Sequence, residues 1–237
     1  MNWEIIHIDE TDSTNSWLAQ KCAGGQFPCA VVAEFQTAGR GCGTNKWESE
    51  RGQNLLYSMM IHPTDVPANK QFVVSMAVAN SIAKVVSKYV KSVSVKWPND
   101  IYVRDRKLCG ILIENRLQGG VIKDSIIGVG LNVNQLRFVS DAPNPVSLAN
   151  LTGRLFDREE LLRELLENFD AELADLEGVR ARYLSQLYRR KGFHLYRDAW
   201  GELYAEIVTV EDDGHLVLRN VDGFTHRYAF KEVTFII

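Results

Sequence analysis

Two strand-like segments separated by a pair of glycines place a strong limit on the fold. They span residues 108–115 and 121–133, and Gly119-Gly120 lies between them. Glycine tolerates the positive φ angles of a tight turn, so consecutive strands are expected here. Further apolar or alternating runs predict strands at residues 3–8, 29–35, 55–61, 93–97 and 101–103. These segments are therefore predicted to be the strands of the main body of the chain.

Helices are expected between and after these strands. Residues 12–14 offer helix N-cap chemistry before Trp17. After Pro67, apolar residues recur at spacings of three and four and predict a core-facing helix stripe: Phe72, Met76, Ala79, Ile82, Val86 and Tyr89. Asp157 and Glu160 resemble a capping box, and a single helix rich in acidic residues is expected from there to Glu177. Residues 179–191 carry basic residues and no acidic one. Neighbouring solvated helix faces explain this reversal, and a docking surface for a charged partner is the alternative.

The chain changes character from Phe193 onward. Short alternating runs predict strands at residues 203–210, 216–218, 228–230 and 233–237. They are separated by Asp213-Gly214 and Asp222-Gly223, and both dipeptides favour tight hairpin turns. We therefore predict a small β-barrel appended to an α+β body. The predicted boundary places the body in residues 1–187 and the barrel in residues 188–237.

The composition excludes several classes of protein. Lysine and arginine number 27 against 30 aspartates and glutamates, so a net charge of −3 argues against general attraction to nucleic acid. No apolar run approaches the roughly 18 residues of a membrane-spanning helix, and the N-terminus lacks the pattern of a signal peptide. The cysteines form no CxxC motif and the histidines no HExxH motif. A chain in a reducing cytosol is the expectation.

Candidate chemistry lies first in a glycine-rich segment, residues 36–43. Glycines at every second position can turn backbone N–H groups toward an anion, and Arg40 adds a forked charge that suits phosphate or carboxylate. The segment is not a Walker loop, because no GK[ST] follows. It is a poor dinucleotide fingerprint, because residues 44–48 do not begin an apolar helix. A plain turn is the alternative interpretation.

The segment KWPND, residues 96–100, is the second candidate. Pro98 stiffens a strand end and presents an amide and a carboxylate just beyond it. Such a carboxylate can hold magnesium, orient a cation or accept a proton, whereas an ordinary Asn-Asp turn is the alternative.

Two more segments carry polar groups on strands. Lys107 precedes an apolar run and can direct its ammonium toward a ligand lying over Gly110, or it is an exposed edge lysine. In residues 128–134, glycines permit close backbone approach, and Asn132 offers a donor and an acceptor suited to a base edge.

Together, and in this order, these segments closely resemble those of biotin–protein ligases. The series comprises DSTN (12–15), QTAGRG (36–41), KWPND (96–100), KLCGILIE (107–114) and GVGLNVN (128–134). The resemblance covers nearly the whole chain, and KWPND with KLxGIL is its most specific part.

The resemblance implies a fold and an activity. The fold would be a mixed β-sheet flanked by helices, of the class II synthetase-like type, with a small C-terminal SH3-like β-barrel. The activity would be ATP-dependent formation of biotinyl-5′-AMP, followed by transfer of biotin to one lysine of a biotin carboxyl carrier protein. Mg²⁺ is expected on the ATP phosphates and not in a protein cage. The first strand begins too close to DSTN for a preceding DNA-binding domain, so we expect a monofunctional cytoplasmic ligase with neither a nucleic acid nor a membrane as partner.

The resemblance also assigns roles to individual residues. The predicted catalytic residues are Lys107, Asp100 and Arg40. The predicted biotin-binding residues are Ser13, Thr14, Asn15, Gln36, Gly39, Arg40, Gly41, Cys42, Lys107 and Gly110. The predicted ATP- or adenylate-binding residues are Arg40, Trp47, Lys96, Asn99, Lys107 and Asn132. Trp47 would close over the nucleotide, and Asp100 would act on the acceptor lysine or help to organise the first step.

One departure from the family pattern concerns Cys42. Many relatives carry an arginine at this position, and that arginine helps to retain the adenylate. We expect a leakier intermediate here unless Lys46 or another cation substitutes for it. A lipoate–protein ligase and a non-catalytic biotin- or nucleotide-binding adaptor remain alternative functions, and homodimerisation stays open.

Overall fold

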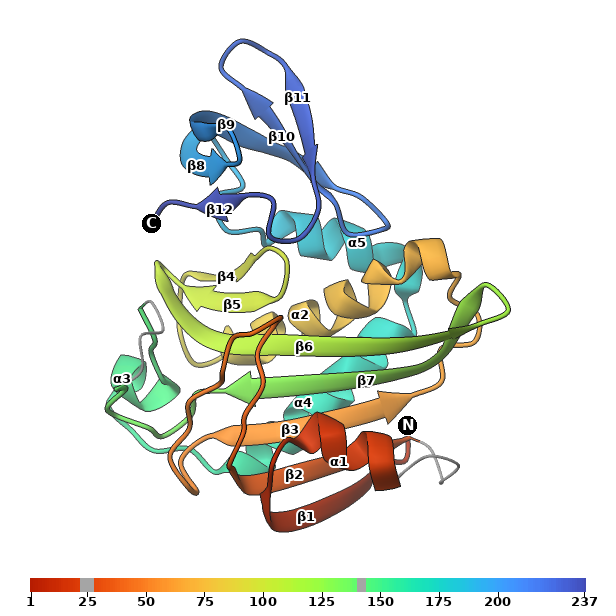
Figure 1. The fold of residues 1–237 in the computed structure, drawn as a ribbon. Helices are drawn as coiled ribbons and strands as arrows, with labels where there is room; N and C mark the ends of the chain where they lie inside the picture. Colours follow the sequence, from red (N-terminus) through yellow and green to blue (C-terminus); the bar gives the residue numbers. More distant parts are fainter. Residues whose placement is uncertain (22–27, 140–143) are drawn as a thin grey trace.

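The computed structural model describes residues 1–21, 28–139 and 144–237 (Figure 1). Within these ranges, the larger sheet has seven strands in the order β1-β2-β3-β7-β6-β5-β4. Its strands are β1 (Glu4–Thr11), β2 (Cys29–Gln36), β3 (Leu55–Ile61), β4 (Val93–Lys96), β5 (Asp100–Val103), β6 (Arg106–Gln118) and β7 (Val121–Leu131). β1 runs parallel to β2 and the other neighbours are antiparallel, so the sheet is mixed. Every strand predicted for this body is present, with small shifts at the ends.

The centre of the sheet follows directly from sequence. β3 is buried at every position and β2 at its first five, as expected of strands covered on both faces. β6 and β7 pair along most of their length, and Gly119 and Gly120 make the turn between them with φ values of 63° and 82°. The predicted glycine turn therefore sets the register of the longest strand pair.

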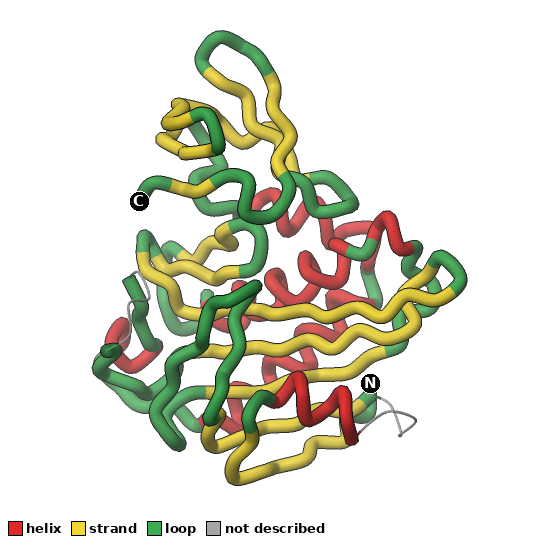
Figure 2. Tube along the Cα trace, in the orientation of Figure 1, coloured by secondary structure: helices red, strands yellow, loops and turns green. Residues whose placement is uncertain are grey.

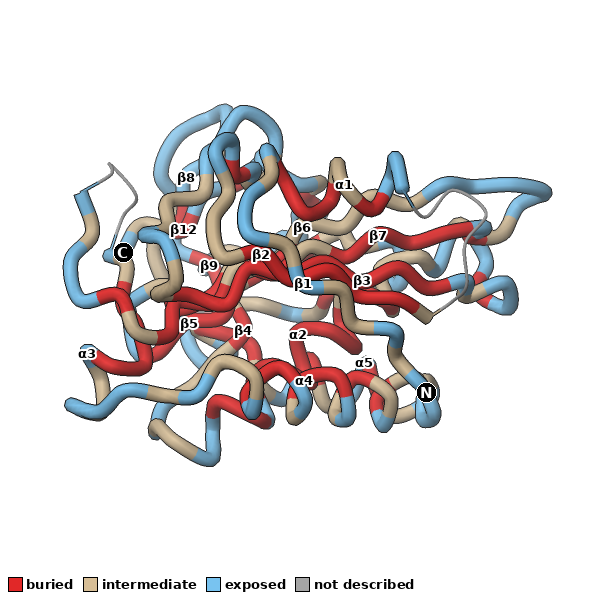
Figure 3. Tube along the Cα trace, turned by 90° about the horizontal axis from the view of Figure 1, so that it is seen from below, coloured by how far each residue is buried: buried red, intermediate tan, exposed pale blue. Residues whose placement is uncertain are grey.

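Helices cover the two faces of this sheet unequally (Figures 1 and 3). On one face lie α2 (Phe72–Val86), α4 (Arg158–Leu173) and α5 (Leu176–Ser185). On the opposite face lie α1 (Thr14–Lys21) and the segment between β2 and β3, which crosses in front of β6 and β7. A core-facing α2 is confirmed, because the middle of its predicted stripe is buried and only the end residues Phe72 and Tyr89 are partly exposed.

The single helix expected from residue 157 to residue 177 is wrong. Asp157 does cap α4, but α4 ends at Leu173 and a second helix begins at Leu176. The cause is Asp175, whose carboxylate accepts a hydrogen bond from the backbone N–H of Gly178 and so begins a new helix. One acidic residue within the run is therefore the N-cap of a second helix. The sequence analysis placed a helix start only at residue 157.

The basic residues of α5 are not only a solvated face. Arg182 is ion-paired with Glu172 and Asp175, which close the turn between α4 and α5. Arg180 donates to the hydroxyl of Thr209 and to the carbonyl of Val210 in the C-terminal strands. At Arg180 and Arg182, the basic residues of this segment therefore make contacts within the chain.

One short helix, α3 (Leu148–Thr152), was not predicted. Ser147 and Asn150 form a reciprocal capping box at its start, and Gly153 ends it in the left-handed conformation. A one-turn 3₁₀ helix, Ala68–Lys70, also precedes α2. Such short elements lack the apolar periodicity on which helix prediction depends. No helix in the described part of the chain is long and apolar enough to cross a bilayer.

The C-terminal residues form a separate antiparallel sheet in the order β11-β10-β9-β8-β12 (Figure 2). Its strands are β8 (His194–Asp198), β9 (Gly201–Val210), β10 (Leu216–Asn220), β11 (Thr225–Tyr228) and β12 (Thr234–Phe235). Gly214 and Gly223 make the two predicted turns at positive φ. A strand at residues 228–230 was expected, but β11 ends at Tyr228, and β8 was not predicted. The sheet forms a small C-terminal β domain, whose exact boundary at residue 188 stays a prediction.

Trp97 fixes this β domain to the body. The indole is buried, and its Nε1 donates to the carbonyl oxygen of Gly214 at 2.8 Å. Its ring also contacts Phe230, with centroids 6.4 Å apart. A Cβ on Gly214 would lie 2.7 Å from the Phe72 ring, so the β9–β10 turn packs directly on the start of α2. The KWPND segment therefore holds the C-terminal domain beside the main sheet.

Candidate ligand-binding and active site

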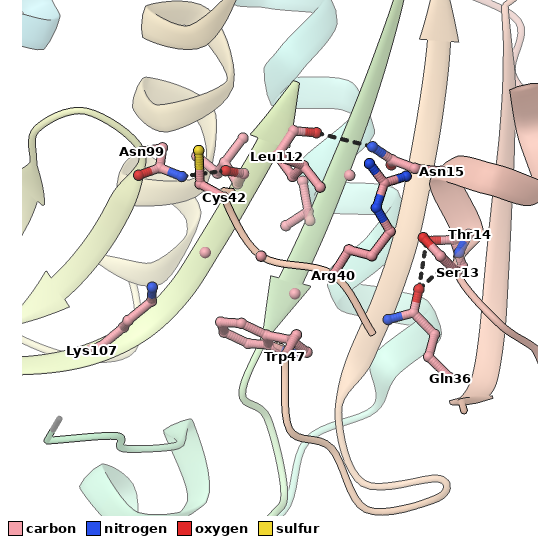
Figure 4. A pocket seen from close by; sticks show the side chains of 16 residues that line it. Ser13, Thr14, Asn15, Gln36, Arg40, Cys42, Trp47, Asn99, Lys107 and Leu112 are labelled. Atoms are coloured by element: carbon pink, nitrogen blue, oxygen red, sulfur yellow. Dashed lines mark hydrogen bonds between the residues drawn. The ribbon is translucent and has the colours of Figure 1, made fainter. Parts of the chain in front are cut away.

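A pocket lies on the α1 face of the main sheet, over β6 and β7 (Figure 4). It is lined by Ser13, Thr14, Asn15, Gln36, Arg40, Gly41, Cys42, Trp47, Asn99, Lys107, Gly110, Ile111, Leu112, Gly128, Val129 and Gly130. These residues come from all five sequence segments singled out by their motifs. The fold thus gathers positions that are far apart in the chain.

One end of the pocket, which we call the neutral end, is lined by the neutral polar residues Ser13, Thr14, Asn15 and Gln36. Ser58 does not line the pocket itself but is hydrogen-bonded to Thr14 and Asn15. The Thr14 hydroxyl and backbone N–H both donate to Gln36 Oε1, at 3.0 and 2.8 Å. Ser58 Oγ lies 2.6 Å from Thr14 Oγ1 and from Asn15 Oδ1. Thr14, Asn15 and Ser58 are buried, so these bonds fix donors and acceptors in a low-dielectric wall.

The pocket also carries two cations, Arg40 and Lys107, which together we call the cationic end. Lys107 lies across the pocket from the neutral end, whereas Arg40 lies beside Asn15 (Figure 4). Arg40 Nη2 lies 2.6 Å from Glu114 Oε1, and Glu114 also accepts from Asn15 Nδ2 at 2.7 Å. Lys107 Nζ lies 2.6 Å from Asp100 Oδ1. Both cations are therefore ion-paired with carboxylates.

Trp47 lies across the strands between the two ends. A Cβ on Gly130 would overlap the indole, and one on Gly110 would lie 2.8 Å from it, so the ring rests on bare backbone. Lys107 Nζ is 5.6 Å from the ring centroid, a cation–π distance. The indole Nε1 is buried and has no acceptor among the described residues. The predicted closure of Trp47 over a nucleotide stays a prediction, but the ring already lies in the pocket.

The space left open in the pocket is small, about 50 Å³. Pockets for small ligands in proteins usually measure roughly 300–1,000 Å³. A ligand larger than a few atoms therefore requires the Trp47 segment to move. A buried indole N–H without an acceptor costs free energy, which favours that movement.

The glycine-rich segment folds back on itself beside the pocket. Trp47 N–H donates to the Gly39 carbonyl at 2.9 Å, and Gly41 N–H donates to the Asn45 carbonyl at 2.8 Å. A Cβ on Gly39 would lie 2.6 Å from the Trp47 carbonyl oxygen, so a larger residue would push the two arms apart. Burial raises the pKa of the neighbouring Cys42 thiol, an effect that the charge of Lys231 partly offsets.

Eleven of the predicted site residues line this pocket, and four do not: Gly39, Lys96, Asp100 and Asn132. Asp100 touches the site through Lys107. Lys96 stacks on the rings of Tyr102 and Phe235, and burial lowers its pKa. The roles predicted for these four residues stay predictions.

Asn132 is buried just beyond the end of β7. Its Nδ2 donates to the Val146 carbonyl at 3.1 Å, whereas its Oδ1 has no donor among the described residues. Asn99 does line the pocket, and its Nδ2 donates to the Ile111 carbonyl at 2.6 Å. The two asparagines thus occupy different surroundings, although both were predicted on the nucleotide side.

The sequence analysis missed several residues that line the pocket or bond to residues that line it. Ser58 is the lone polar residue in the otherwise apolar strand LLYSMMI, a signal that could have marked it. Glu114 was quoted in a motif but given no role, because its partner Arg40 is distant in sequence. Gly128 was noted for close approach, and Asn15 proves to be the group that its missing side chain accommodates.

The pocket offers little to a bare metal ion. None of the residues that line it is a carboxylate. Elsewhere in the described chain, Glu211, Asp213 and His215 bring ligand atoms within 4.8 Å of one another. Arg227, however, is ion-paired with both carboxylates, so that cluster is already neutralised.

This geometry suits a ligand with two unlike parts. The neutral end can bind an uncharged polar head by donors and acceptors that are already oriented. The cationic end can bind an anion if that anion replaces Glu114 or Asp100 as the partner of a cation. The site can therefore hold a neutral polar head and pair with anionic groups at Arg40 and at Lys107.

Comparison with known proteins agrees with this organisation. The model of the biotin/lipoate A/B protein ligase family matches residues 8–132. The bifunctional ligase/repressor BirA of Salmonella typhimurium is 36% identical over 187 residues, which are 77% of this chain and 58% of that protein. A biotin–[acetyl-CoA-carboxylase] ligase of Paracoccus denitrificans is 27% identical over 228 residues, 91% of this chain and 94% of that protein.

A solved structure has the same fold. The biotin protein ligase from Aquifex aeolicus in complex with biotin and ATP superposes with a TM-score of 0.80 at 23% identity, covering 98% of this chain and 97% of that chain. The mixed sheet, its flanking helices and the small C-terminal β domain thus define the fold of a biotin ligase catalytic unit. The chain belongs to the biotin/lipoate A/B protein ligase family.

Proposed function

We propose that this chain is a biotin–protein ligase. It activates biotin with ATP to give biotinyl-5′-AMP and pyrophosphate, and then transfers biotin to a lysine of a biotin carboxyl carrier protein. The observation that carries the proposal is the pairing, in one pocket, of a fixed neutral polar end with two ion-paired cations.

Biotin has the two unlike parts that this pocket suits. Its ureido ring is neutral and offers two N–H donors and one carbonyl acceptor, which match the hydroxyls and amides of the neutral end. Its carboxylate lies at the far end of a flexible apolar chain. We infer that the ring binds at Thr14, Asn15 and Ser58, and that the carboxylate reaches toward Lys107.

The first step brings two anions together. A carboxylate oxygen of biotin attacks the α-phosphorus of ATP, the bond between that phosphorus and the bridging oxygen breaks, and pyrophosphate leaves. Lys107 and Arg40 offset the repulsion and the charge that develops on the phosphate oxygens. Each cation must exchange its carboxylate partner for the substrate during this step.

Magnesium is proposed to enter with the nucleotide. The described lining residues include no carboxylate, so the phosphates themselves would hold the ion, and the pocket would add only neutral oxygens such as that of Asn99. Bound in this way, the ion would neutralise charge on the phosphate chain.

The second step needs an uncharged amine. The acceptor lysine, with an ordinary pKa of about 10.4, must lose a proton before it attacks the mixed anhydride and releases AMP. Asp100 is proposed to accept that proton once Lys107 has turned to the phosphate. Its carboxylate is ion-paired with Lys107, so that movement of Lys107 would free it to act as a base.

Biotin-dependent exchange of label between pyrophosphate and ATP tests the first step. We expect exchange with biotin and at least tenfold slower exchange with lipoate. Faster exchange with lipoate would favour a lipoate ligase. Tight biotin binding without exchange, and without transfer to an apo carrier domain, would favour a binding adaptor.

A further inference from the structure

The side chain of Lys231 crosses from the C-terminal β domain to the glycine-rich segment. A Cβ built on Gly43 would overlap its Nζ, so the ammonium lies directly against that backbone. Gly43 has a φ of +68°, in the left-handed region that favours glycine. The neighbouring residue, Cys42, lines the pocket, and the charge of Lys231 is close enough to act on its thiol. The two domains therefore meet at the edge of the pocket.

The position of Lys231 is held by the body of the protein. Lys231 has a φ of 72° in a turn closed by the bond from Glu232 N–H to the Ala229 carbonyl. The preceding residue, Phe230, packs its ring against Trp97, whose indole also binds the β9–β10 turn. A left-handed lysine in a turn anchored on both sides is directed toward the pocket by its surroundings.

Lys231 differs from the other cations at this site. Arg40 is ion-paired with Glu114 and Lys107 with Asp100, whereas Lys231 has no carboxylate within 4 Å in the described part of the chain. It is exposed, and its Nζ lies 5.9 Å from the centroid of the Phe230 ring. An anion that arrives at the glycine-rich segment therefore finds in Lys231 a cation that does not have to give up a carboxylate first.

We propose that Lys231 binds the phosphate chain of ATP, so that the C-terminal β domain completes the nucleotide site across Gly43. The inference rests on the function proposed above and extends it to a residue that no motif contains. It also gives Cys42 an explanation, because a cation supplied from the other domain makes a cation at position 42 unnecessary. Lys46, on the same segment, is the competing cation.

The test compares Lys231→Met with matched lysine variants in the full chain. We expect Lys231→Met to raise the KM for ATP in biotin-dependent exchange about tenfold, equal to about 1.4 kcal/mol, and to leave the KM for biotin within twofold. Lys231→Arg retains the charge and keeps a near-normal KM. The control is Lys84→Met, an exposed position on α2, which changes neither constant.

Rescue separates a binding role from a structural one. Cys42→Arg placed in the Lys231→Met chain restores a cation to the same edge, and we expect it to recover most of the affinity for ATP. An unchanged KM for ATP in Lys231→Met overturns the inference, and a rise in Lys46→Met instead assigns the role to Lys46. If the wild-type protein exchanges no label, the proposed function is overturned. Calorimetric titration with magnesium pyrophosphate then still tests Lys231, because the inference requires Lys231→Met to weaken pyrophosphate binding.

Discussion

The two ends of the pocket differ in how they are prepared for a ligand. At the neutral end, Thr14, Asn15 and Ser58 are buried and bonded to one another in a fixed arrangement. At the cationic end, Arg40 and Lys107 are bonded to carboxylates, and Trp47 covers the strands between them. Once the Trp47 segment has moved, the neutral end needs no change of partners to bind a ligand, whereas the cations must exchange their carboxylate partners.

The difference follows from the physics of the groups involved. Neutral hydrogen-bonding groups can be buried together at little cost when each finds a partner. A half-buried cation without a counter-ion is costly, so the chain supplies a carboxylate that substrate can later replace. Recognition of the neutral head is thus expected to precede and to be separable from the charge exchange that supports chemistry.

The largest expected effect comes from Lys107 at the cationic end. Lys107→Met removes the ammonium that we propose faces the reacting groups, and we expect the rate of biotin-dependent pyrophosphate exchange to fall by about 100- to 1,000-fold. Biotin affinity without ATP, measured by calorimetry, should change much less. A loss of biotin affinity as large as the loss of rate would contradict the proposal that the neutral end binds biotin and the cationic end supports the chemistry.

Asp100 is expected to have the next largest effect. Asp100→Asn keeps the shape but removes the charge that holds Lys107 at 2.6 Å, and we expect transfer to the carrier to slow by about 100-fold. Exchange and transfer from preformed biotinyl-5′-AMP are measured separately. A fall in both shows that Asp100 acts through Lys107, and a fall in transfer alone shows that it acts on the acceptor amine. Unimpaired turnover on a carrier domain would reject both roles.

At the neutral end, Ser58→Ala should produce a smaller and different change. It removes a hydroxyl that lies between Thr14 and Asn15 and leaves their polar atoms less well satisfied. We expect the KM for biotin to rise about fivefold and unfolding free energy to fall by about 1 kcal/mol, with kcat nearly constant. Ser185→Ala, at an exposed serine of α5, is the matched control. A selective fall in kcat would show that the neutral end takes part in the chemistry.

The smallest expected effect concerns the carboxylate that holds Arg40. Glu114→Gln keeps a hydrogen-bonding side chain but weakens the ion pair, so Arg40 becomes available to ligand more often. We expect a non-hydrolysable biotinyl-5′-AMP analogue to bind about threefold more tightly in calorimetric titration. Weaker binding by the variant would mean that Glu114 holds Arg40 in its binding position.

The strands and the motifs of the body were predictable from sequence because both are local signals. Alternating or apolar runs, bounded by turn residues, located every strand of the main sheet. Glycines at residues 119, 120, 214 and 223 marked the turns correctly, because these positions need positive φ. The pocket residues were predicted from the order of the motifs along the chain. Hydrophobic periodicity alone would not have identified them.

What sequence missed depends on contacts between distant residues. The pairing of Arg40 with Glu114 joins two motifs across the sheet, and neither residue indicates its partner. Lys231 lies in no motif, and contacts between the two domains, such as the packing of Phe230 on Trp97, bring it to the glycine-rich segment. The break between α4 and α5 was missed because Asp175, the cap of the second helix, resembles the other acidic residues around it.

The central claim is that this pocket activates biotin for transfer to a carrier lysine. Its most direct test is the intact mass of an apo biotin carboxyl carrier domain after incubation with the protein, ATP, Mg²⁺ and biotin. We predict a gain of one biotinyl group, which disappears when ATP is omitted or when the acceptor lysine of the carrier is replaced by arginine. An unchanged carrier mass under the complete conditions would contradict the account.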